Sequence, residues 1–358
     1  MTRSQLPDPE QKRYYPYVTR SILRLMKKGL LTNVVSVDIE PDYGYVARLT
    51  YLNGLHRITY GNDLGLNNAA ACDLAKDKGH AKFMLRTIGV ECPAGDEFIL
   101  PWWEEMIGQT QRERGNTSLR TTDDIPDYIE QQMGYPVYLK PVSGSKGGDI
   151  FTVQNRAELE MVVELYNEKR IRVIVVEAPV KMPDYRVVVL DGELISAYRR
   201  VPLTVVGDGV HTIKELLAQL QQRYDDEGRD TQLNPDDERI RRHLAQDNMT
   251  VTDIPEAGRS LVLVPISNLS AGGTSEDITD SIHERWTNLA AQISENFNLR
   301  LIGLDLACED ITSPTAKYSV IEVNSSPGLD HYALSGDAQK ELVDQFYIKI
   351  LNALPAGV

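Results

Sequence analysis

The sequence predicts an α+β protein in which antiparallel strands pack against helices on one side, with a short α/β region at its N-terminus. Two hairpins support this. In residues 34–52 apolar runs flank the turn sequence PDYG, and residues 185–200 are divided by Asp191-Gly192, a pair favoured in type I′ turns. Residues 157–168 show the apolar spacing of an amphipathic helix. Helices therefore alternate with antiparallel pairs.

The remaining elements follow from the same periodicities, taken in chain order. We expect helices at 17–30, from Leu66 to Gly89, near 102–114 and 122–134, and at 157–168 and 336–352; strands on both sides of a glycine loop within 138–150; a buried strand that ends at Glu177; strands at 260–266, 299–310 and 318–324; and an exposed, charge-rich helical insertion around 225–242.

Composition excludes several classes of protein. The 358 residues allow two or three domains, and a net charge of -14 argues against a nucleic-acid binder, which needs a basic face. No run approaches the roughly 18 apolar residues of a membrane span, and no signal peptide is visible, so we expect a cytoplasmic protein that does not contact a membrane. Cys72, Cys92 and Cys308 lack metal-ligand spacing and indicate reduced thiols.

A glycine-rich stretch with one lysine just before it and a second lysine, Lys146, within it raises the question of phosphate binding. Lys140 ends an apolar strand, and the loop SGSKGG at 143–148 follows it. Glycines let backbone N–H groups approach an anion, and a lysine adds a compact positive charge. The alternative is a flexible hairpin loop with a solvated lysine.

Oxygen-bearing side chains interrupt two apolar strands nearer the C-terminus. Glu322 and Asn324 are two residues apart and so share one face of their strand, while Asp305 interrupts another apolar run. If the strands pair, three hard oxygen ligands meet, which suits Mg²⁺ completed by substrate phosphates, with Mn²⁺ as the alternative ion. The bland alternative is polar residues of an edge strand facing water. With the glycine loop, the set predicts a Mg-ATP site.

In this order, the parts resemble the ATP-grasp fold, in which two α+β lobes close on ATP. The resemblance implies an N-terminal region with a connecting helix at 1–90, a small lobe at 91–180, and a large lobe at 181–358 with a helical insertion at about 207–258. It also implies ATP contacts from Lys78, Lys140, Ser143, Gly144, Ser145, Lys146, Gly147, Gly148, Glu177, Ala178, Val180 and Asp184, and metal ligation by Asp305, Glu322 and Asn324.

Residues from about 70 to 335 are similar to the ATP-grasp modules of cyanophycin synthetases and bifunctional glutathione synthetases, notably in SNLSAGGTSEDITDSIHERW and VIEVNSSPGLDHY. The resemblance implies a ligase that activates a carboxylate as an acyl phosphate and joins it to an amine. Its substrates would be amino acids or small peptides. One departure is Gly303, where many ATP-grasp ligases carry an arginine.

Further residues are assigned to the chemistry. Arg186 and Arg200 are the candidates for stabilising the oxyanion, and strand alternation leaves Arg199 as a solvated ion-pair partner. We expect residues 268–277 to form a second glycine-rich loop, and we expect Asn268, Gly272, Gly273, Thr274, Ser325, Ser326 and Gly328 to contact substrate. A phosphotransferase and a non-catalytic ATP-binding regulatory protein are the alternatives, and a homodimer is left open.

Overall fold

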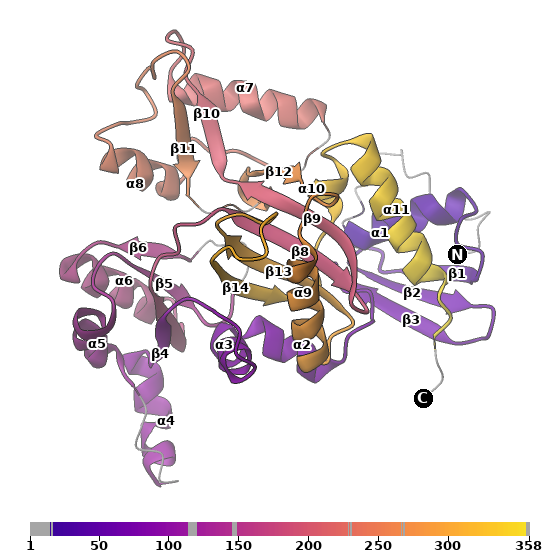
Figure 1. Cartoon of the computed structure of the whole chain (residues 1–358), viewed down its shortest axis with the longest axis horizontal. Coiled ribbons are helices and arrows are strands. Elements are labelled where there is room, and N and C mark those ends of the chain that lie inside the picture. Colours follow the sequence, from indigo (N-terminus) through magenta and orange to yellow (C-terminus); the bar gives the residue numbers. More distant parts are fainter. Residues whose placement is uncertain are drawn as a thin grey trace.

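In the part of the chain that the structure describes, four antiparallel sheets form the framework, and helices pack against them (Figure 1). The computed structural model describes residues 15, 17–113, 120–144, 149–227, 229, 231–265, 267 and 269–355. This mixture of antiparallel sheets and helices confirms the predicted α+β class. Within the described part of the chain, every helix is too short or too polar to cross a membrane.

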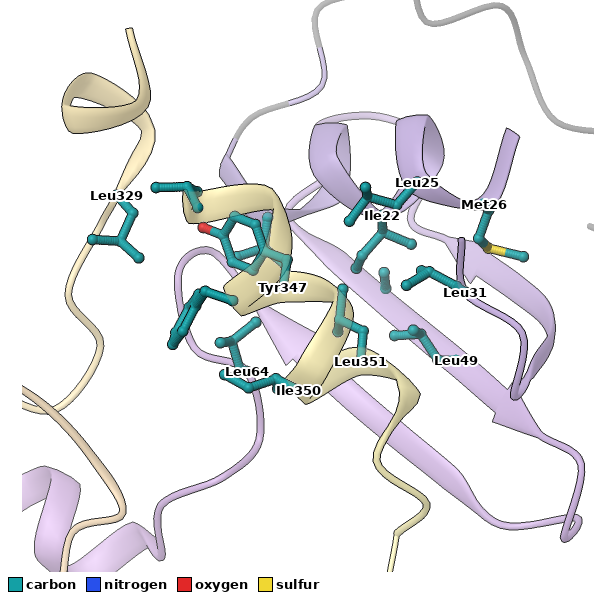
Figure 2. Packing of buried hydrophobic residues seen from close by; sticks show 14 of the residues in the cluster. Ile22, Leu25, Met26, Leu31, Leu49, Leu64, Leu329, Tyr347, Ile350 and Leu351 are labelled. Carbon is teal, nitrogen blue, oxygen red and sulfur yellow. The ribbon is translucent and has the colours of Figure 1, made fainter. Parts of the chain in front are cut away.

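The N-terminal sheet is a three-stranded meander covered on one face by two helices from opposite ends of the chain (Figure 1). Its elements are β1 (Val34–Ile39), β2 (Val46–Tyr51), β3 (His56–Tyr60), α1 (Tyr17–Lys27) and α11 (Asp337–Asn352). Figure 2 shows Ile22 of α1 and Leu351 of α11 meeting near Leu49 of β2. Arg57 also donates to the carbonyl of Ile350 at 2.8 Å. The C-terminal helix, expected with the large lobe, therefore also completes the core of the N-terminal region.

The connection to the small lobe is two helices, not the single helix expected from Leu66 to Gly89. These are α2 (Ala69–Lys76) and α3 (Lys78–Thr87). Asp77 has an extended backbone that ends α2, and its carboxylate accepts hydrogen bonds from the N–H groups of Gly79 and His80, which caps α3. The break gives Lys78 a place in the first turn of a new helix.

The small lobe is a four-stranded sheet in the order β4-β7-β5-β6 with a core between sheet and helices. The elements are β4 (Gly95–Ile99), α4 (Pro101–Glu113), the 3-10 turn Thr122–Asp124, α5 (Ile125–Gln132), β5 (Val137–Pro141), β6 (Phe151–Val153), α6 (Arg156–Glu168) and β7 (Val173–Glu177). β5 and β6 pair directly, so the glycine loop lies between two strands, as predicted. β4 was not expected from the sequence.

The large lobe is a five-stranded sheet in the order β12-β9-β8-β13-β14. Its elements are β8 (Asp184–Leu190), β9 (Glu193–Val201), β12 (Thr274–Asp277), α9 (Glu284–Asn296), β13 (Leu301–Cys308), β14 (Tyr318–Asn324) and α10 (Asp330–Ala333). Asp191 and Gly192 both have positive φ, as a type I′ hairpin requires. β13 and β14 are neighbours, so the two strands that carry the oxygen ligands pair, as the magnesium hypothesis needed.

The insertion has its own small sheet and core. It contains β10 (Leu203–Val206), α7 (Ile213–Asp226), α8 (Glu238–Gln246) and β11 (Ser260–Val264). The stretch 225–242 is not one helix. α7 ends at Asp226, α8 begins at Glu238, and the described residues between them are not helical. Residues 268–277 were expected as a glycine-rich loop. Their last four residues instead form β12, which pairs with β9, after a 3-10 turn at Leu269–Ala271.

Candidate active site

A buried carboxylate in the small lobe binds two lysines. Glu177 ends β7, and Lys140 from the neighbouring β5 places its Nζ 2.7 Å from Glu177 Oε2. Lys82 of α3 contacts the other carboxylate oxygen. Burial alone would raise the pKa of Glu177, but the two ammonium groups outweigh it and hold that pKa below its usual range. Glu177 is therefore ionised and orients both lysines.

Lys78 joins the glycine loop to the large lobe. Its Nζ lies 3.1 Å from Glu322 Oε1 on β14 and donates to the carbonyl of Gly144 at 3.2 Å. Its backbone N–H donates to the carbonyl of Val142 at 2.9 Å. One ammonium group thus contacts both the start of the loop and a carboxylate on the opposite lobe.

Two arginines and two aspartates form a buried network on the large sheet. Asp305 lies in register between Arg186 on β8 and Glu322 on β14. Arg186 binds one carboxylate oxygen of Asp305, and Arg200 Nη1 lies 3.0 Å from the other. Arg200 Nη2 also donates to Asp184 at 2.7 Å. Burial raises the pKa of Asp305, but the two guanidinium groups outweigh it and lower that pKa overall. Asp305 is thus held as an anion.

The oxygen donors of Asp305, Glu322 and Asn324 suit a hard cation by their chemistry. Asp305 and Glu322 are direct cross-strand partners, and Asn324 lies opposite Gly303 two pairs further along the same strands. In the described residues no three acidic, histidine or cysteine side chains gather as a ligand set. A magnesium ion here would rely on two carboxylates, the Asn324 amide oxygen and ligand phosphates.

Gly303 lets the loop after β14 lie close to Arg186. A Cβ at position 303 would lie 2.7 Å from Pro327 Cβ and 3.1 Å from Arg186 Cδ, so glycine makes room for both. Asn67, just before α2, donates to the carbonyls of Leu301 and Ser325 at 2.8 and 2.7 Å. These two hydrogen bonds connect β13 to Ser325, the first residue of the loop 325–328 (the SSPG loop).

Side chains of the insertion hydrogen-bond to the backbone of residues 269–274. Tyr224 of α7 donates to the carbonyl of Gly272 at 2.8 Å, and Arg229 donates to the carbonyl of Gly273 at 2.8 Å while stacking on the Tyr224 ring. A cavity of about 210 Å³ lies between this segment, α7 and the end of β9. Thr274 lines it and is strand partner to Val201, the residue after Arg200.

Nine of the predicted residues take part in the contacts described above, in three groups: Lys140 with Glu177, Lys78 with Gly144 and Glu322, and the ion-pair network of Asp184, Arg186, Arg200 and Asp305. Ser145, Lys146, Gly147, Gly148 and Asn268 lie outside the described residues. Ser143 is exposed at the start of the loop. The N–H of Ala178 is taken by the carbonyl of Ala94 at 2.8 Å. Ala178 therefore has only its carbonyl to offer adenine, and adenine contacts at Val180 stay a prediction.

Sequence reasoning overlooked Lys82 and Asn67. Lys82 follows Lys78 by four residues and so lies on the same face of α3, a spacing that could have identified it. No pattern in the sequence around Asn67 indicates its role, because its partners are backbone groups more than 200 residues away. Arg199, by contrast, is half exposed and pairs with Glu276 at 3.3 Å, as expected of a surface ion pair.

Comparisons with known proteins agree with this geometry. The family described as prokaryotic glutathione synthetase, ATP-grasp domain, matches residues 114–209, and the RimK-like ATP-grasp domain matches residues 265–346. This chain belongs to the ATP-grasp superfamily. The two matched stretches leave residues 210–264 between them, the segment that carries α7 and α8.

Relatives of this ATP-grasp chain are longer proteins. It is 29% identical over 265 residues to a cyanophycin synthetase of Crocosphaera subtropica, covering 72% of this chain and 28% of that one. It is 31% identical over 212 residues to a bifunctional glutathione biosynthesis protein of Streptococcus agalactiae, covering 56% and 28%. The bifunctional glutathione synthetase structure from Pasteurella multocida superposes with a TM-score of 0.55 at 22% identity, over 93% of this chain and 44% of that one. The chain thus spans little more than a quarter of these curated relatives, and the structural likeness supports the ATP-grasp fold.

Proposed function

We propose that this chain is an ADP-forming carboxylate–amine ligase, which makes an amide bond between amino acids or small peptides through an acyl phosphate. One observation carries the proposal. Lys78 Nζ lies 3.2 Å from the carbonyl oxygen of Gly144 in the glycine loop and 3.1 Å from Glu322 Oε1 on β14. The backbone expected to bind phosphate and the oxygens expected to bind the metal therefore meet at one ammonium group, which supports a site for phosphoryl transfer from ATP.

The first step would transfer the γ-phosphoryl group of ATP to a carboxylate oxygen of the substrate and release ADP. Lys140 and Lys82, oriented by Glu177, and Lys78 would hold the phosphates as charge shifts between them. Magnesium held by Asp305, Glu322 and Asn324 supplies charge neutralisation of the phosphates when bound. Most of the catalysis is then positioning and electrostatics.

In the second step the amine nitrogen would attack the carbonyl carbon of the acyl phosphate. The carbon–nitrogen bond forms, phosphate leaves, and the nitrogen gives up a proton to solvent. Arg186 and Arg200 would stabilise the oxyanion that develops on the carbonyl oxygen. Arg200 Nε is buried and has no hydrogen-bond partner among the described residues, which leaves it one unused donor.

The test is ADP release by purified protein with Mg-ATP, offered amino acids and dipeptides in pairs, with mass spectrometry of the active wells. ADP formed only with two substrates, and a product lighter than their sum by one water, supports the ligase. ADP with one substrate and a gain of one phosphoryl group identifies a phosphotransferase. Tight ATP binding without turnover in any well identifies a binding protein. Either of the last two results overturns the ligase.

A further inference from the structure

The N-terminal region reaches the active site through Asn62. This residue follows β3 in a short turn that is closed by the hydrogen bond from the N–H of Gly65 to the Asp63 carboxylate at 2.8 Å. The Asn62 side chain packs on Gly328 of the SSPG loop. A Cβ added at position 328 would lie only 2.7 Å from Asn62 Nδ2. The carboxamide thus occupies the space that the absence of a side chain at Gly328 leaves open.

The amide oxygen of Asn62 is buried and lacks a hydrogen-bond partner among the described residues. Most buried polar side-chain atoms are paired, because an unpaired one forfeits its hydration without compensation. A buried acceptor that stays unpaired beside a ligand loop is therefore a candidate for pairing with the ligand.

Asn62 is connected to Arg186 through the loop after β14. Gly328 follows Pro327, which packs over Gly303, and Gly303 in turn borders the stem of Arg186. Asn67, five residues after Asn62, is fastened to the carbonyl of Ser325 at 2.7 Å. The segment from Asn62 to Asn67 therefore contacts the SSPG loop at its first residue, Ser325, and at its last, Gly328. Pro327 and Gly303 lie between this loop contact and the stem of Arg186.

We propose that Asn62 is a substrate-binding residue whose Oδ1 accepts a hydrogen bond from an N–H group of the amine substrate. The inference rests on the proposed ligase function and deepens it. An amide oxygen can only accept. Phosphates and an ionised carboxylate carry no donors, and the adenine end of ATP is assigned to the segment after Glu177. The attacking amine must bring its N–H groups to the acyl carbon beside Arg186, which is why we assign the contact to it. An amino group on the carboxylate substrate would instead appear in the KM for that substrate.

The experiment compares Asn62→Leu and Asn62→Asp with wild type, using the substrate pair that the ADP assay identifies. Leucine is similar in size and cannot hydrogen-bond, while aspartate keeps the acceptor. We expect Asn62→Leu to raise KM for the amine about three- to tenfold, with KM for ATP and for the carboxylate substrate unchanged, and Asn62→Asp to stay near wild type. Asn53→Leu is the matched control, because Asn53 is exposed at the opposite end of the β2–β3 hairpin.

An equal rise in all three KM values, or no rise for the amine, overturns the inference and leaves the ligase standing. If Asn62→Leu does not fold, Gly328→Ala takes its place, since its methyl group displaces the Asn62 carboxamide and should raise the amine KM in the same way. If no pair yields ADP, the ligase proposal fails by itself. Calorimetry then measures the affinity of wild type and of Asn62→Leu for each dipeptide of the panel. Equal affinities overturn the inference, and weaker binding by the variant supports it.

Discussion

The stem of Arg186 fills the space beside Gly303 that another residue's side chain would need. A Cβ at position 303 would approach Arg186 Cδ to 3.1 Å and Pro327 Cβ to 2.7 Å. A guanidinium group from the neighbouring strand therefore stands where many ATP-grasp ligases carry an arginine on the metal-binding strand itself. The departure noted in the sequence is compatible with an active site, because β8 supplies the positive charge beside Asp305.

Gly303→Ala should accordingly destabilise the protein and slow turnover. The added methyl group must push Pro327 or Arg186 aside, and overpacking of this kind costs about 1–3 kcal/mol of unfolding free energy. Denaturant titration and ADP release together measure the effect. Gly144→Ala is the control for stability, since a Cβ there meets nothing within 4 Å and its φ is not positive. Equal stability of the Gly303 variant and wild type would contradict the packing described here.

Glu177→Gln should destabilise the small lobe strongly. The change leaves Lys140 and Lys82 buried without their counter-charge, and removal of one partner of a buried ion pair typically costs about 3–5 kcal/mol. Urea unfolding of the variant checks this. The double variant Glu177→Gln, Lys82→Met should recover part of the loss, because one unpaired ammonium is removed. A single variant within about 0.5 kcal/mol of wild type would show that the three side chains are not coupled.

Lys78→Ala should reduce turnover by at least about a hundredfold with little change in folding, because charge placed on the phosphates is worth several kcal/mol in the transition state. Lys76→Ala is the matched control, two residues earlier and exposed beside Asp73. Steady-state ADP release with saturating substrates provides the measurement. Similar kcat values for the two variants would argue against Lys78 as the group that links the two lobes.

The hairpins and the two strands around the glycine loop could be predicted, because each depends on local periodicity or on one turn. Alternation also placed Glu322 and Asn324 on one face of their strand. The pairing of that strand with the Asp305 strand was only a condition of the magnesium hypothesis, and the register that places Glu322 opposite Asp305 had no signal in the sequence. Contacts between segments far apart in the chain could not be predicted from the sequence. α11 lies against the N-terminal sheet, and Asn67 binds carbonyls of β13 and of the loop after β14. Such contacts use shape and backbone groups, which leave no pattern in nearby residues.

The break at Asp77 illustrates a different failure. Apolar spacing continues across it, so a helix from Leu66 to Gly89 was the natural prediction. An Asp that caps the following helix won over the periodicity, because its carboxylate satisfies N–H groups that would otherwise lack partners. The same local competition divides the charge-rich stretch after α7, where Asp237 caps α8.

His211 should titrate above its ordinary value because of Asp208. The Asp208 carboxylate lies 2.6 Å from His211 Nδ1 and raises the pKa of the imidazole by hydrogen bonding and charge. The folded state then binds the proton more tightly than the unfolded state does. Its contribution to stability is complete below about pH 6.5 and is lost as the pH rises through the raised pKa. NMR titration of His211 tests this, and Asp208→Asn should bring the midpoint down. A midpoint at or below 6.5 in wild type would refute the pairing.

Arg199 and Arg200 are adjacent in sequence, but substitution of Arg200 should do far more damage than substitution of Arg199. Arg200→Ala leaves Asp184 and Asp305 in a buried site with one guanidinium fewer, so we expect a loss of about 3–5 kcal/mol in unfolding free energy. Turnover should fall with it, since the candidate oxyanion donor is gone. Arg199→Ala removes only an exposed pair with Glu276, worth about 0–1 kcal/mol.

Arg200→Lys separates the two roles of that side chain. An ammonium keeps the charge but cannot contact Asp184 and Asp305 with the planar fork of a guanidinium. Stability should therefore recover partly while kcat stays low. Denaturant unfolding and ADP release on the three variants give the comparison. If Arg199→Ala proved as damaging as Arg200→Ala, the assignment of the buried face of β9 to the active site would be wrong.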